Sequence, residues 1–532
     1  MLGLLITLAP ALNLLAAGRA KYFVLVVWDG MRPDFVSLEL TPALYALREN
    51  GVWFANHHSA FPTSTEVNGT VLATGVFPHR SGISANKEYR PAIDPLKQFG
   101  TESLTAVRRG DELSGRKYVR VPTVAELVQA KGERTAVSGA KGVALLHDRQ
   151  PRPVDSENPV WFATGSLPDE SFNGLTNRLG SFPAAVSPNL ARDTWTTRCL
   201  TEVFWRKELP RYSLLWLSEP DYSQHQHGPG SPQALAAIRS CDQRLAMVLA
   251  ELDRRGVRDE TDVLVVSDHG FSTIGRNGDT AATLQGAGIN ARRAWDEPPK
   301  SNDMVVAGNG GSVLLYVMGH SPAVIEKTVA ALQQSPNSGV LFTHDGIPGT
   351  FALAEARLDS PTAPDVIVAS SWKMTAENGS QPRSEIINDG YSEYNPGGGM
   401  HVTLSPTDLH NLAVAAGPDF RRGVTSPLPS GNVDIAPTLL WLMGITPPEP
   451  LEGRVLSEAL LAEAPPLRGI ELNRREARNE SPQGIWRQYL KFTEVNGVRY
   501  LDEGNGGRTP NPNPATMPNR TAVDSTSSSS SN

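Results

Sequence analysis

The chain has 532 residues, and its 49 Lys and Arg against 56 Asp and Glu give a net charge of −7 at pH 7. Hydrophobic residues make up 39% and charged residues 20%, which is typical of a folded protein and too apolar for a disordered one. The negative charge argues against binding to a nucleic-acid duplex, because such proteins neutralise phosphates with a basic surface. With 2 cysteines, a disulfide scaffold and a Cys-rich zinc site are excluded.

Residues 1–20 (MLGLLITLAPALNLLAAGRA) are mostly apolar, contain no acidic residue and end in small residues. This pattern predicts a signal peptide and hence an exported protein, periplasmic or secreted. A short membrane anchor and a misassigned start codon are the alternatives. Pro10 interrupts the run and no later run is long enough, so we expect no stable membrane span. In an oxidising compartment Cys199 and Cys241 could pair, and two buried free thiols are an equal alternative.

Beyond residue 21, short apolar runs alternate with amphipathic helical patterns. Helices are predicted where Pro stands in the first turn, over residues 122–131, 232–255 and 322–333. Unbroken runs rich in Val and Leu suit strands that are buried on both faces of a parallel sheet. These runs are 22–28 (YFVLVVW), 213–217 (SLLWL), 262–267 (DVLVVS), 312–317 (SVLLYV) and 365–369 (DVIVA). The alternation predicts an α/β three-layer sandwich with a mostly parallel central sheet.

The composition divides the chain into segments. We expect one catalytic domain over residues 21–461, with an insertion within about 270–400 that forms a cap over the site. A C-terminal extension would cover 462–503. Residues 504–532 are rich in Gly, Asn, Pro and Ser, which predicts a disordered tail.

Acidic residues follow three of the predicted strands. Asp29 follows the first strand, Asp221 and His225 follow the second, and Asp268 and His269 follow the third. Ligands bind beyond the carboxyl ends of the strands in such sheets. One Asp there is ordinarily a helix cap or a turn residue, but three of them with two histidines indicate a metal site. Carboxylates and imidazoles without thiolates favour Zn²⁺, with Mn²⁺ or Fe as alternatives.

Hydroxyl residues gather between the first two strands, in residues 61–70 (FPTSTEVNGT). Thr65 stands at the start of a predicted short helix, where free backbone N–H groups bind anions such as phosphate. Taken alone, Thr65 is as well explained as a helix N-cap.

Four blocks together resemble the nucleotide pyrophosphatase/phosphodiesterase branch of the alkaline-phosphatase superfamily. They are residues 27–34 (VWDGMRPD), 62–68 (PTSTEVN), 219–229 (EPDYSQHQHGP) and 267–270 (SDHG). The resemblance spans about residues 22 to 460 and places Thr65 at the family's nucleophile. Asn86, which lies 21 residues later, falls at its phosphate-contacting asparagine. His401, after three glycines, supplies the final ligand; His410 is the competitor, but it begins an apolar run and is more simply a core residue.

The resemblance implies an alkaline-phosphatase-like fold and two Zn²⁺ ions. One ion would be held by Asp221, His225 and His401, and the other by Asp29, Asp268 and His269, with Thr65 bound to it or close by. Hydrolysis of a phosphate ester can demand a rate enhancement approaching ~10²¹. Acid–base catalysis typically supplies only ~10²–10⁴, whereas paired divalent metals stabilise the developing charge directly.

The activity that this implies is hydrolysis of a small-molecule phosphate ester through a phosphothreonine on Thr65. The N–H group after Thr65 and the side-chain amide of Asn86 would hold the remaining oxygen. Phosphodiesterase or nucleotide pyrophosphatase activity is the leading interpretation. No feature of the sequence indicates an oligomeric state.

Two positions depart from the family's pattern. Glu66 stands where the branch carries an aromatic clamp for the nucleobase, and a carboxylate cannot stack and would repel a phosphate. Lys141 stands where phosphomonoesterase and phosphonoacetate-hydrolase relatives can carry a phosphate-facing lysine, unless it is an exposed loop residue. Both are candidate substrate-binding residues, and they keep a phosphomonoesterase or phosphonate hydrolase as alternatives. A non-catalytic metal- or phosphate-binding protein is the alternative from another class.

Overall fold

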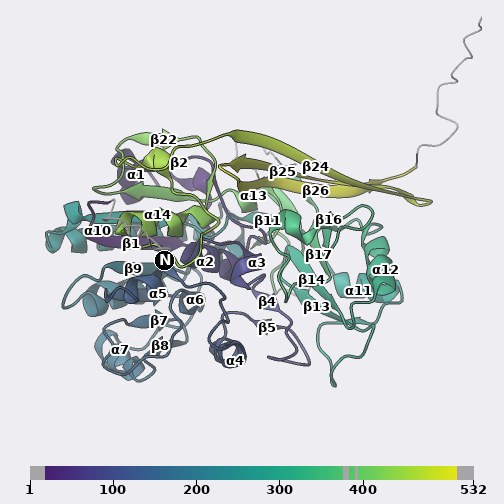
Figure 1. The fold of residues 1–532 in the computed structure, drawn as a ribbon, viewed down its shortest axis with the longest axis horizontal. Coiled ribbons are helices and arrows are strands. Elements are labelled where there is room, and N and C mark those ends of the chain that lie inside the picture. Colours follow the sequence, from purple (N-terminus) through teal and green to yellow (C-terminus); the bar gives the residue numbers. More distant parts are fainter. Residues whose placement is uncertain (1–17, 376–382, 390–392, 512–532) are drawn as a thin grey trace, which may run out of the picture.

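The computed structural model describes residues 18–375, 383–389 and 393–511, and its largest feature is a nine-stranded sheet (Figure 1). The strands lie in the order β22 (Val424–Ser426), β2 (Val52–Phe54), β21 (Ala413–Ala416), β10 (Thr261–Val266), β1 (Tyr22–Trp28), β9 (Tyr212–Leu217), β6 (Thr135–Gly139), β7 (Val160–Phe162) and β8 (Gly165–Leu167). The five strands from β10 to β7 are parallel, whereas β21 and β8 are antiparallel to their neighbours. The predicted mostly parallel central sheet is therefore confirmed.

Strand β1 is apolar at every position, without the usual alternation of apolar and polar residues, because both of its faces are buried. Phe23, Leu25 and Val27 pack into one core, and the residues between them pack into a second core on the opposite face. Helices supply the other side of each core. One face is covered by α1 (Pro42–Glu49), α8 (Leu190–Arg198) and α10 (Pro232–Arg254), and the other by α2 (Thr65–Thr74), α5 (Val124–Gln129), α6 (Ala144–His147) and α14 (Ile435–Met443).

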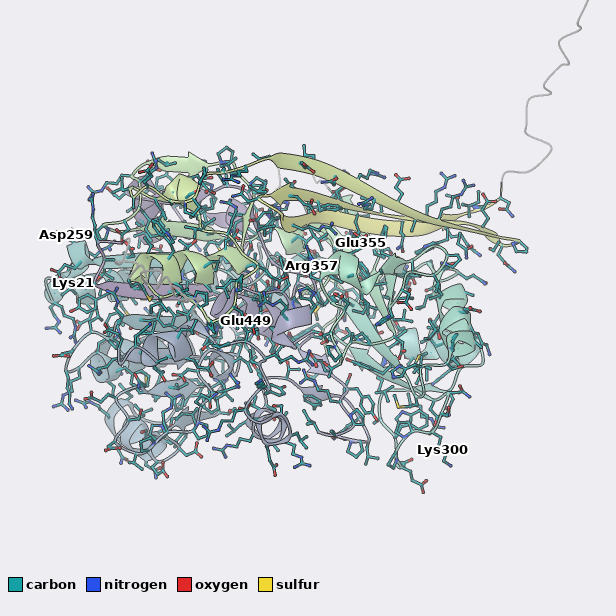
Figure 2. The ribbon with its side chains drawn as sticks, viewed as in Figure 1. Lys21, Asp259, Lys300, Glu355, Arg357 and Glu449 are labelled. Atoms are coloured by element: carbon teal, nitrogen blue, oxygen red, sulfur yellow. The ribbon has the colours of Figure 1, made fainter. Side chains whose placement is uncertain are left out.

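The parallel strands all start at one edge of the molecule. Figure 2 labels Lys21, directly before β1, and Asp259, two residues before β10, at that edge. The carboxyl ends point away from it, toward the part of the chain that follows β10. Other helices in the rest of the chain are α3 (Pro78–Ser81), α4 (Leu104–Ser114), α7 (Ser171–Leu179), α9 (Asp221–His227) and α13 (Pro406–Leu409).

The insertion after β10 builds a second sheet. Its six strands lie in the order β12 (Ala291–Arg292), β13 (Met304–Gly308), β14 (Ser312–Val317), β17 (Val366–Ser370), β15 (Ser338–Thr343) and β16 (Phe351–Ala352). Helices α11 (Thr280–Gly286) and α12 (Pro322–Leu332) share a core with it. The assignment of 312–317 and 365–369 to a parallel sheet is wrong, because β14 and β17 pair antiparallel here. Both faces of β14 are buried, so its sequence looks like that of a parallel strand.

A four-stranded sheet joins the insertion to the central sheet. It contains β18 (Trp372–Thr375), β19 (Arg383–Asp389), β11 (Ser272–Gly278) and β20 (Gly399–Met400). β20 pairs antiparallel with the start of β11, so the chain returns beside β10 at the end of the insertion. Two short pairs complete the strands: β3 (His57–His58) with β23 (Ser430–Gly431), and β4 (Lys87–Glu88) with β5 (Phe99–Gly100).

The C-terminal extension is an antiparallel three-stranded sheet of β24 (Ile470–Ser481), β25 (Gly484–Val495) and β26 (Val498–Thr509). The three strands run along the side of the second sheet in Figure 1. Leu490 and Phe492 share a core with that sheet. The predicted start of the disordered tail at 504 is wrong, because residues 504–509 pair with β25. Backbone hydrogen bonds between strands need no particular side chain, so a Gly-rich segment can form a strand although its composition predicts disorder. The rest of the predicted tail, from residue 512, lies outside the described residues.

Most of the predicted signal peptide, residues 1–17, also lies outside the described residues. Residues 18–20 are bonded to the fold: the Gly18 N–H donates to the Leu442 carbonyl at 3.1 Å, and the Ala20 N–H to Asp419 Oδ2 at 3.0 Å. Cys199 and Cys241 are buried free thiols. Among the helices of the described ranges, none has the length and apolar character that a membrane crossing requires.

Candidate active site

Three neighbouring parallel strands bring their carboxyl-end acids to one place. Asp29 follows β1, Asp221 begins α9 shortly after β9, and Asp268 lies two residues beyond β10. All three side chains are buried. His225 lies one helical turn after Asp221 on α9, and its Nε2 is 3.2 Å from Oδ1 of Asp221.

His401 reaches the same place from the far end of the insertion. It directly follows β20, and its Nε2 lies 3.6 Å from Oδ1 of Asp221. Its ring stacks on that of His269 with the centroids 3.7 Å apart. The structure thus brings together two groups: Asp221, His225 and His401 (the first ligand set), and Asp29, Asp268 and His269 (the second ligand set). Within each set, one ligand atom per residue lies within 4.8 Å of the others.

The hydrogen bonds of these side chains fit divalent metals. Each Nδ1 lies against a backbone carbonyl, which can only accept: His225 with Gly399 at 2.9 Å, His269 with Gly270 at 2.8 Å, and His401 with Thr63 at 2.7 Å. In the neutral tautomer this leaves each Nε2 as an acceptor that faces carboxylate oxygens. One oxygen of each acid has no hydrogen-bond partner within the described part of the chain: Asp29 Oδ1, Asp221 Oδ1 and Asp268 Oδ2. Facing acceptors repel unless they share a cation, so both sets are suited to hold one.

Lys141 fixes the remaining oxygens of two of the acids. Its Nζ lies 2.9 Å from Oδ2 of Asp221 and 3.0 Å from Oδ2 of Asp29. Burial lowers the pKa of Lys141, but the charges of Asp221 and Asp29 outweigh burial and hold the pKa well above its ordinary value. The alternative of an exposed loop lysine is therefore wrong. The ammonium group lies between the two ligand sets and turns Oδ1 of both acids toward the histidines.

Electrostatics keep the first ligand set ready for a cation. Burial raises the pKa of Asp221, but Lys141 and His225 outweigh this and hold it well below its ordinary value. Burial, together with His269 and His225, lowers the pKa of His401 well below its ordinary value. Asp221 is thus ionised and His401 neutral, which are the forms that coordinate a metal.

Asp29 has a partner that no motif revealed. The indole Nε1 of Trp216, on the neighbouring strand β9, donates to Oδ2 of Asp29 at 2.8 Å. Burial and the charge of Asp268 raise the pKa of Asp29 well above its ordinary value. A bound cation favours the ionised carboxylate, so it would relieve the repulsion between these two acids.

Thr65 lies between the second ligand set and a group of anion-binding donors. It is the first residue of α2, and Ser64 occupies the N-cap position, so the alternative that Thr65 is the cap is wrong. Oγ1 of Thr65 lies 3.3 Å from Nε2 of His269. The next N–H, of Glu66, donates to Oδ1 of Asn86 at 3.2 Å. The structure therefore brings Thr65, Asn86 and the free start of α2 together.

Glu66 has a different charge state from the one that the sequence suggests. Burial and the nearby charge of Glu102 raise the pKa of Glu66 well above its ordinary value. The side chain therefore favours the neutral acid, which can donate a hydrogen bond and does not repel a phosphate. Glu102 lies in a segment without a motif and was not predicted. It closely approaches Gly142, where an added Cβ would meet its carboxyl carbon at 2.6 Å.

Comparison with known proteins decides the family. The family model described as type I phosphodiesterase/nucleotide pyrophosphatase matches residues 23–401. The chain belongs to this family. The predicted membership of the nucleotide pyrophosphatase/phosphodiesterase branch of the alkaline-phosphatase superfamily is thereby confirmed.

Individual relatives of this family member are distant. Human ectonucleotide pyrophosphatase/phosphodiesterase family member 1 is 24% identical over 249 residues, which cover 46% of this chain and 23% of that protein. Venom phosphodiesterase 2 of the snake Crotalus adamanteus is 24% identical over 258 residues, covering 47% of this chain and 27% of that protein. The chain thus aligns with about a quarter of the length of these relatives.

A solved structure supports the fold. That of murine ectonucleotide pyrophosphatase/phosphodiesterase 5, an inactive variant in complex with AMP, has a TM-score of 0.57 and 18% identity. The match covers 83% of this chain and 100% of the other. The α/β fold with its mostly parallel central sheet is therefore shared with this structure.

Proposed function

We propose that this protein is a two-metal phosphodiesterase or nucleotide pyrophosphatase that acts through a phosphothreonine on Thr65. One observation carries the proposal: the Thr65 hydroxyl lies 3.3 Å from His269 of the second ligand set, at the free N-terminus of a buried helix. Family membership and the AMP bound by the structural relative support a nucleotide-type ester. The relatives' names support the reaction class.

The first ligand set would hold one divalent metal and the second ligand set the other. We assign zinc because three carboxylates and three imidazoles in close contact, without thiolates, suit this ion, with Mn²⁺ or Fe as alternatives. When bound, the two ions supply electrostatic stabilisation of the charge that develops on the phosphoryl oxygens.

The protein's own residues perform the substitution. Oγ1 of Thr65 attacks phosphorus in line, the bond from phosphorus to the leaving oxygen breaks on the opposite side, and the proton of Oγ1 passes through solvent to that oxygen, so that the alcohol or nucleotide leaves. Water then cleaves the phosphothreonine and returns a proton to Oγ1. The N–H of Glu66 and the side-chain amide of Asn86 would hold the third phosphoryl oxygen, which replaces the 3.2 Å bond between this N–H and Oδ1 of Asn86 and positions the ester for attack.

A phosphomonoesterase or phosphonate hydrolase is the second candidate, and Lys141 favours it. Its ammonium group lies between the ligand sets, where it attracts a dianionic group more strongly than a monoanionic diester. Turnover of an aryl phosphodiester, an aryl phosphomonoester and phosphonoacetate by the zinc-loaded protein separates the candidates. Higher kcat/KM for the diester supports the leading proposal, and preference for either other compound contradicts it. A protein inert toward all three would be a binding protein.

We also propose export, because the apolar N-terminal segment has the composition of a signal peptide and relatives carry ectoenzyme or venom names. Sequencing the N-terminus of the protein recovered from outside the cytoplasm tests this. Since residues 18–20 are bonded to Leu442 and Asp419, we expect cleavage before Gly18.

A further inference from the structure

A third cluster of metal-type side chains lies apart from the two ligand sets. His58, His410 and Asp502 each offer one ligand atom, and these atoms lie within 4.8 Å of one another. The three residues come from β3, from the position after α13 and from β26. The proposed hydrolysis uses none of them.

His58 repeats the arrangement of the three histidines in the ligand sets. It is buried, its Nδ1 lies 2.9 Å from the carbonyl of Ser430, and its Nε2 lies 3.0 Å from Oδ1 of Asp502. Because the carbonyl can only accept, Nδ1 carries a proton. Nε2 must then share either a second proton or a cation with the carboxylate.

His410 distinguishes these two possibilities. Its ring lies 4.4 Å from the ring of His58, and across the described residues its ring nitrogens have no hydrogen-bond partner. The neutral ring of His410 has a lone pair on one nitrogen, within 4.8 Å of the ligand atoms of His58 and Asp502. A proton between His58 and Asp502 leaves this lone pair unused, whereas a metal ion uses all three groups.

Asp502 stands at a β-bulge. Leu501 pairs with Phe492 and Glu503 pairs with Lys491, so Asp502 is the extra residue of β26. Bulges commonly re-aim a side chain next to a functional site. Oδ2 of Asp502 accepts a hydrogen bond from Thr493 at 3.0 Å, which leaves Oδ1 for the histidines. Asp221 and Asp29 have the same division between a fixed and a free oxygen.

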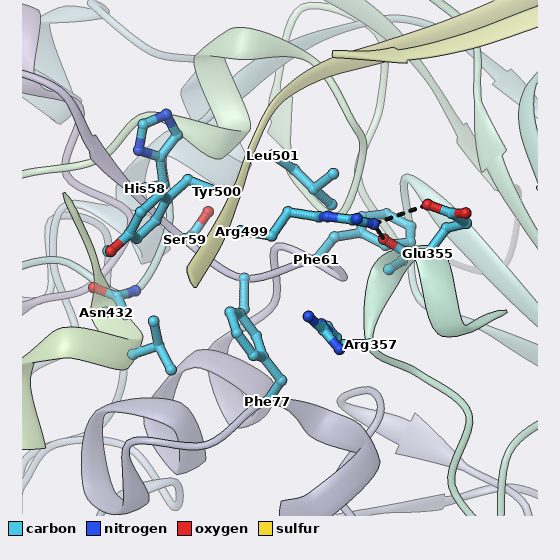
Figure 3. Close-up of a pocket in the computed structure, with 14 residues that line it drawn as sticks. His58, Ser59, Phe61, Phe77, Glu355, Arg357, Asn432, Arg499, Tyr500 and Leu501 are labelled. Carbon is cyan, nitrogen blue, oxygen red and sulfur yellow. Dashed lines mark hydrogen bonds and ion pairs between the residues drawn. The ribbon is translucent and has the colours of Figure 1, made fainter. Parts of the chain in front are cut away.

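Neighbouring residues hold β26 in place, and a cavity lets solvent reach the cluster of His58, His410 and Asp502. Figure 3 shows Tyr500 of β26 beside His58, with the two rings 5.7 Å apart, and Arg499 reaching the other way to pair with Glu355 at 2.8 Å. His410 and Asp502 also line a separate cavity of about 450 Å³. Solvent can therefore complete the coordination.

We propose that His58, His410 and Asp502 bind one divalent transition metal of the zinc type. Two imidazoles and one carboxylate are a usual set of three protein ligands, and the fourth position faces the cavity. The ion would join the C-terminal sheet to β3 and α13. The site is independent of the proposed esterase activity.

The test counts metal ions in the full-length, zinc-loaded protein by mass spectrometry after gel filtration. His410→Gln and Asp502→Asn should each bind one ion fewer than wild type. Glu503→Gln, which changes the next residue and lines the same cavity, should bind the wild-type number. Turnover of an aryl phosphodiester should be retained in His410→Gln, and it reports folding separately from the count.

The proposal is overturned if wild type and both ligand variants bind equal numbers, or if Glu503→Gln loses the same ion. If a ligand variant is too unstable for the metal count after gel filtration, the bound ions can be followed by replacing zinc with cobalt, which absorbs visible light. Visible d–d absorption should fall by about one third from wild type to Asp502→Asn if three similar sites are filled, and an unchanged spectrum overturns the proposal. If wild type shows no esterase activity but still binds one ion more than the two ligand variants, the proposed function is contradicted and the third metal site is not.

Discussion

The ammonium group of Lys141 lies 2.9 Å from Oδ2 of Asp221. Together with its contact to Asp29, this places one fixed positive charge between two groups that we expect to hold metal ions. The positive charge of Lys141 should attract the negative phosphoryl group of a substrate as well as the carboxylates of Asp221 and Asp29. We expect Lys141→Met to lower kcat/KM for an aryl phosphomonoester about tenfold more than for an aryl phosphodiester, a difference of ~1.4 kcal/mol.

Steady-state kinetics on both esters measures this change in ratio. Lys131→Met, which removes an exposed lysine, is the matched control and should leave the ratio at its wild-type value. An equal loss on both esters would mean that Lys141 only positions Asp29 and Asp221 and does not select the substrate.

Thr65→Ala should lower turnover by several orders of magnitude, because no other residue is placed to form the covalent intermediate. The fold should tolerate the change, since Ser64 and not Thr65 is the N-cap of α2, and the free energy of unfolding should change by less than about 1 kcal/mol. Acid quenching during turnover of a labelled substrate should trap phosphate on the peptide that contains Thr65.

Thr70→Ala removes a hydroxyl from the same helix, where it bonds to the carbonyl of Glu66, and should keep near-normal turnover. Label on Thr63 or Ser64, or high activity in Thr65→Ala, would show that the nucleophile is misassigned.

Removal of metal should abolish turnover, and Zn²⁺ should restore it. EDTA treatment followed by titration with Zn²⁺ measures both effects. Asp221→Asn and His401→Ala should fail to recover, because each deletes a ligand that Lys141 or the Thr63 carbonyl now orients. His410→Gln should recover activity, since His410 lies outside both ligand sets. Recovery in His401→Ala would contradict the composition of the first ligand set.

The contribution of Glu219 to the stability of the metal-free protein should fall as pH rises from about 5 to 8. Burial and the charge of Asp193 raise the pKa of Glu219 to about 8 from its ordinary 4.5. The folded state therefore binds a proton that the unfolded state has already released in this window, so deprotonation costs stability. Above pH 8 this contribution is lost.

Urea unfolding at several pH values in EDTA measures this slope. The free energy of unfolding of wild type, taken relative to that of Glu219→Gln at the same pH, should fall across this window, because the amide does not titrate. Glu208→Gln, at an exposed position, should match wild type. Parallel curves for Glu219→Gln and wild type would mean that Glu219 is ionised in the folded protein.

Residues next to strand ends were the most predictable part of this protein. Asp29 directly follows β1, Asp268 lies two residues beyond β10 and Asp221 lies four residues beyond β9, so the end of each apolar run indicates both the strand and a nearby ligand. Thr65 was found through the resemblance of residues 62–68 to the family's nucleophile motif and its distance from Asn86. These signals are local in sequence, and parallel strands bring them to the same edge.

The parts that escaped prediction depend on neighbours that are distant in sequence. β14 looks like a parallel strand because a sheet and helices bury it from both sides, and only its partners reveal the difference. Trp216 looks like an ordinary core residue until its indole is placed beside Asp29. The charge of Glu66 depends on Glu102, which no motif marks. Asp502 lies just before a segment whose Gly-rich composition suggests disorder.

The position of His401 after the whole insertion has a consequence for biosynthesis. A growing chain has all residues of the second ligand set once β10 and His269 have been made, whereas the first ligand set waits until both sheets of the insertion are complete. We therefore expect metal uptake to be sequential during synthesis, with the ion beside Thr65 entering before its neighbour.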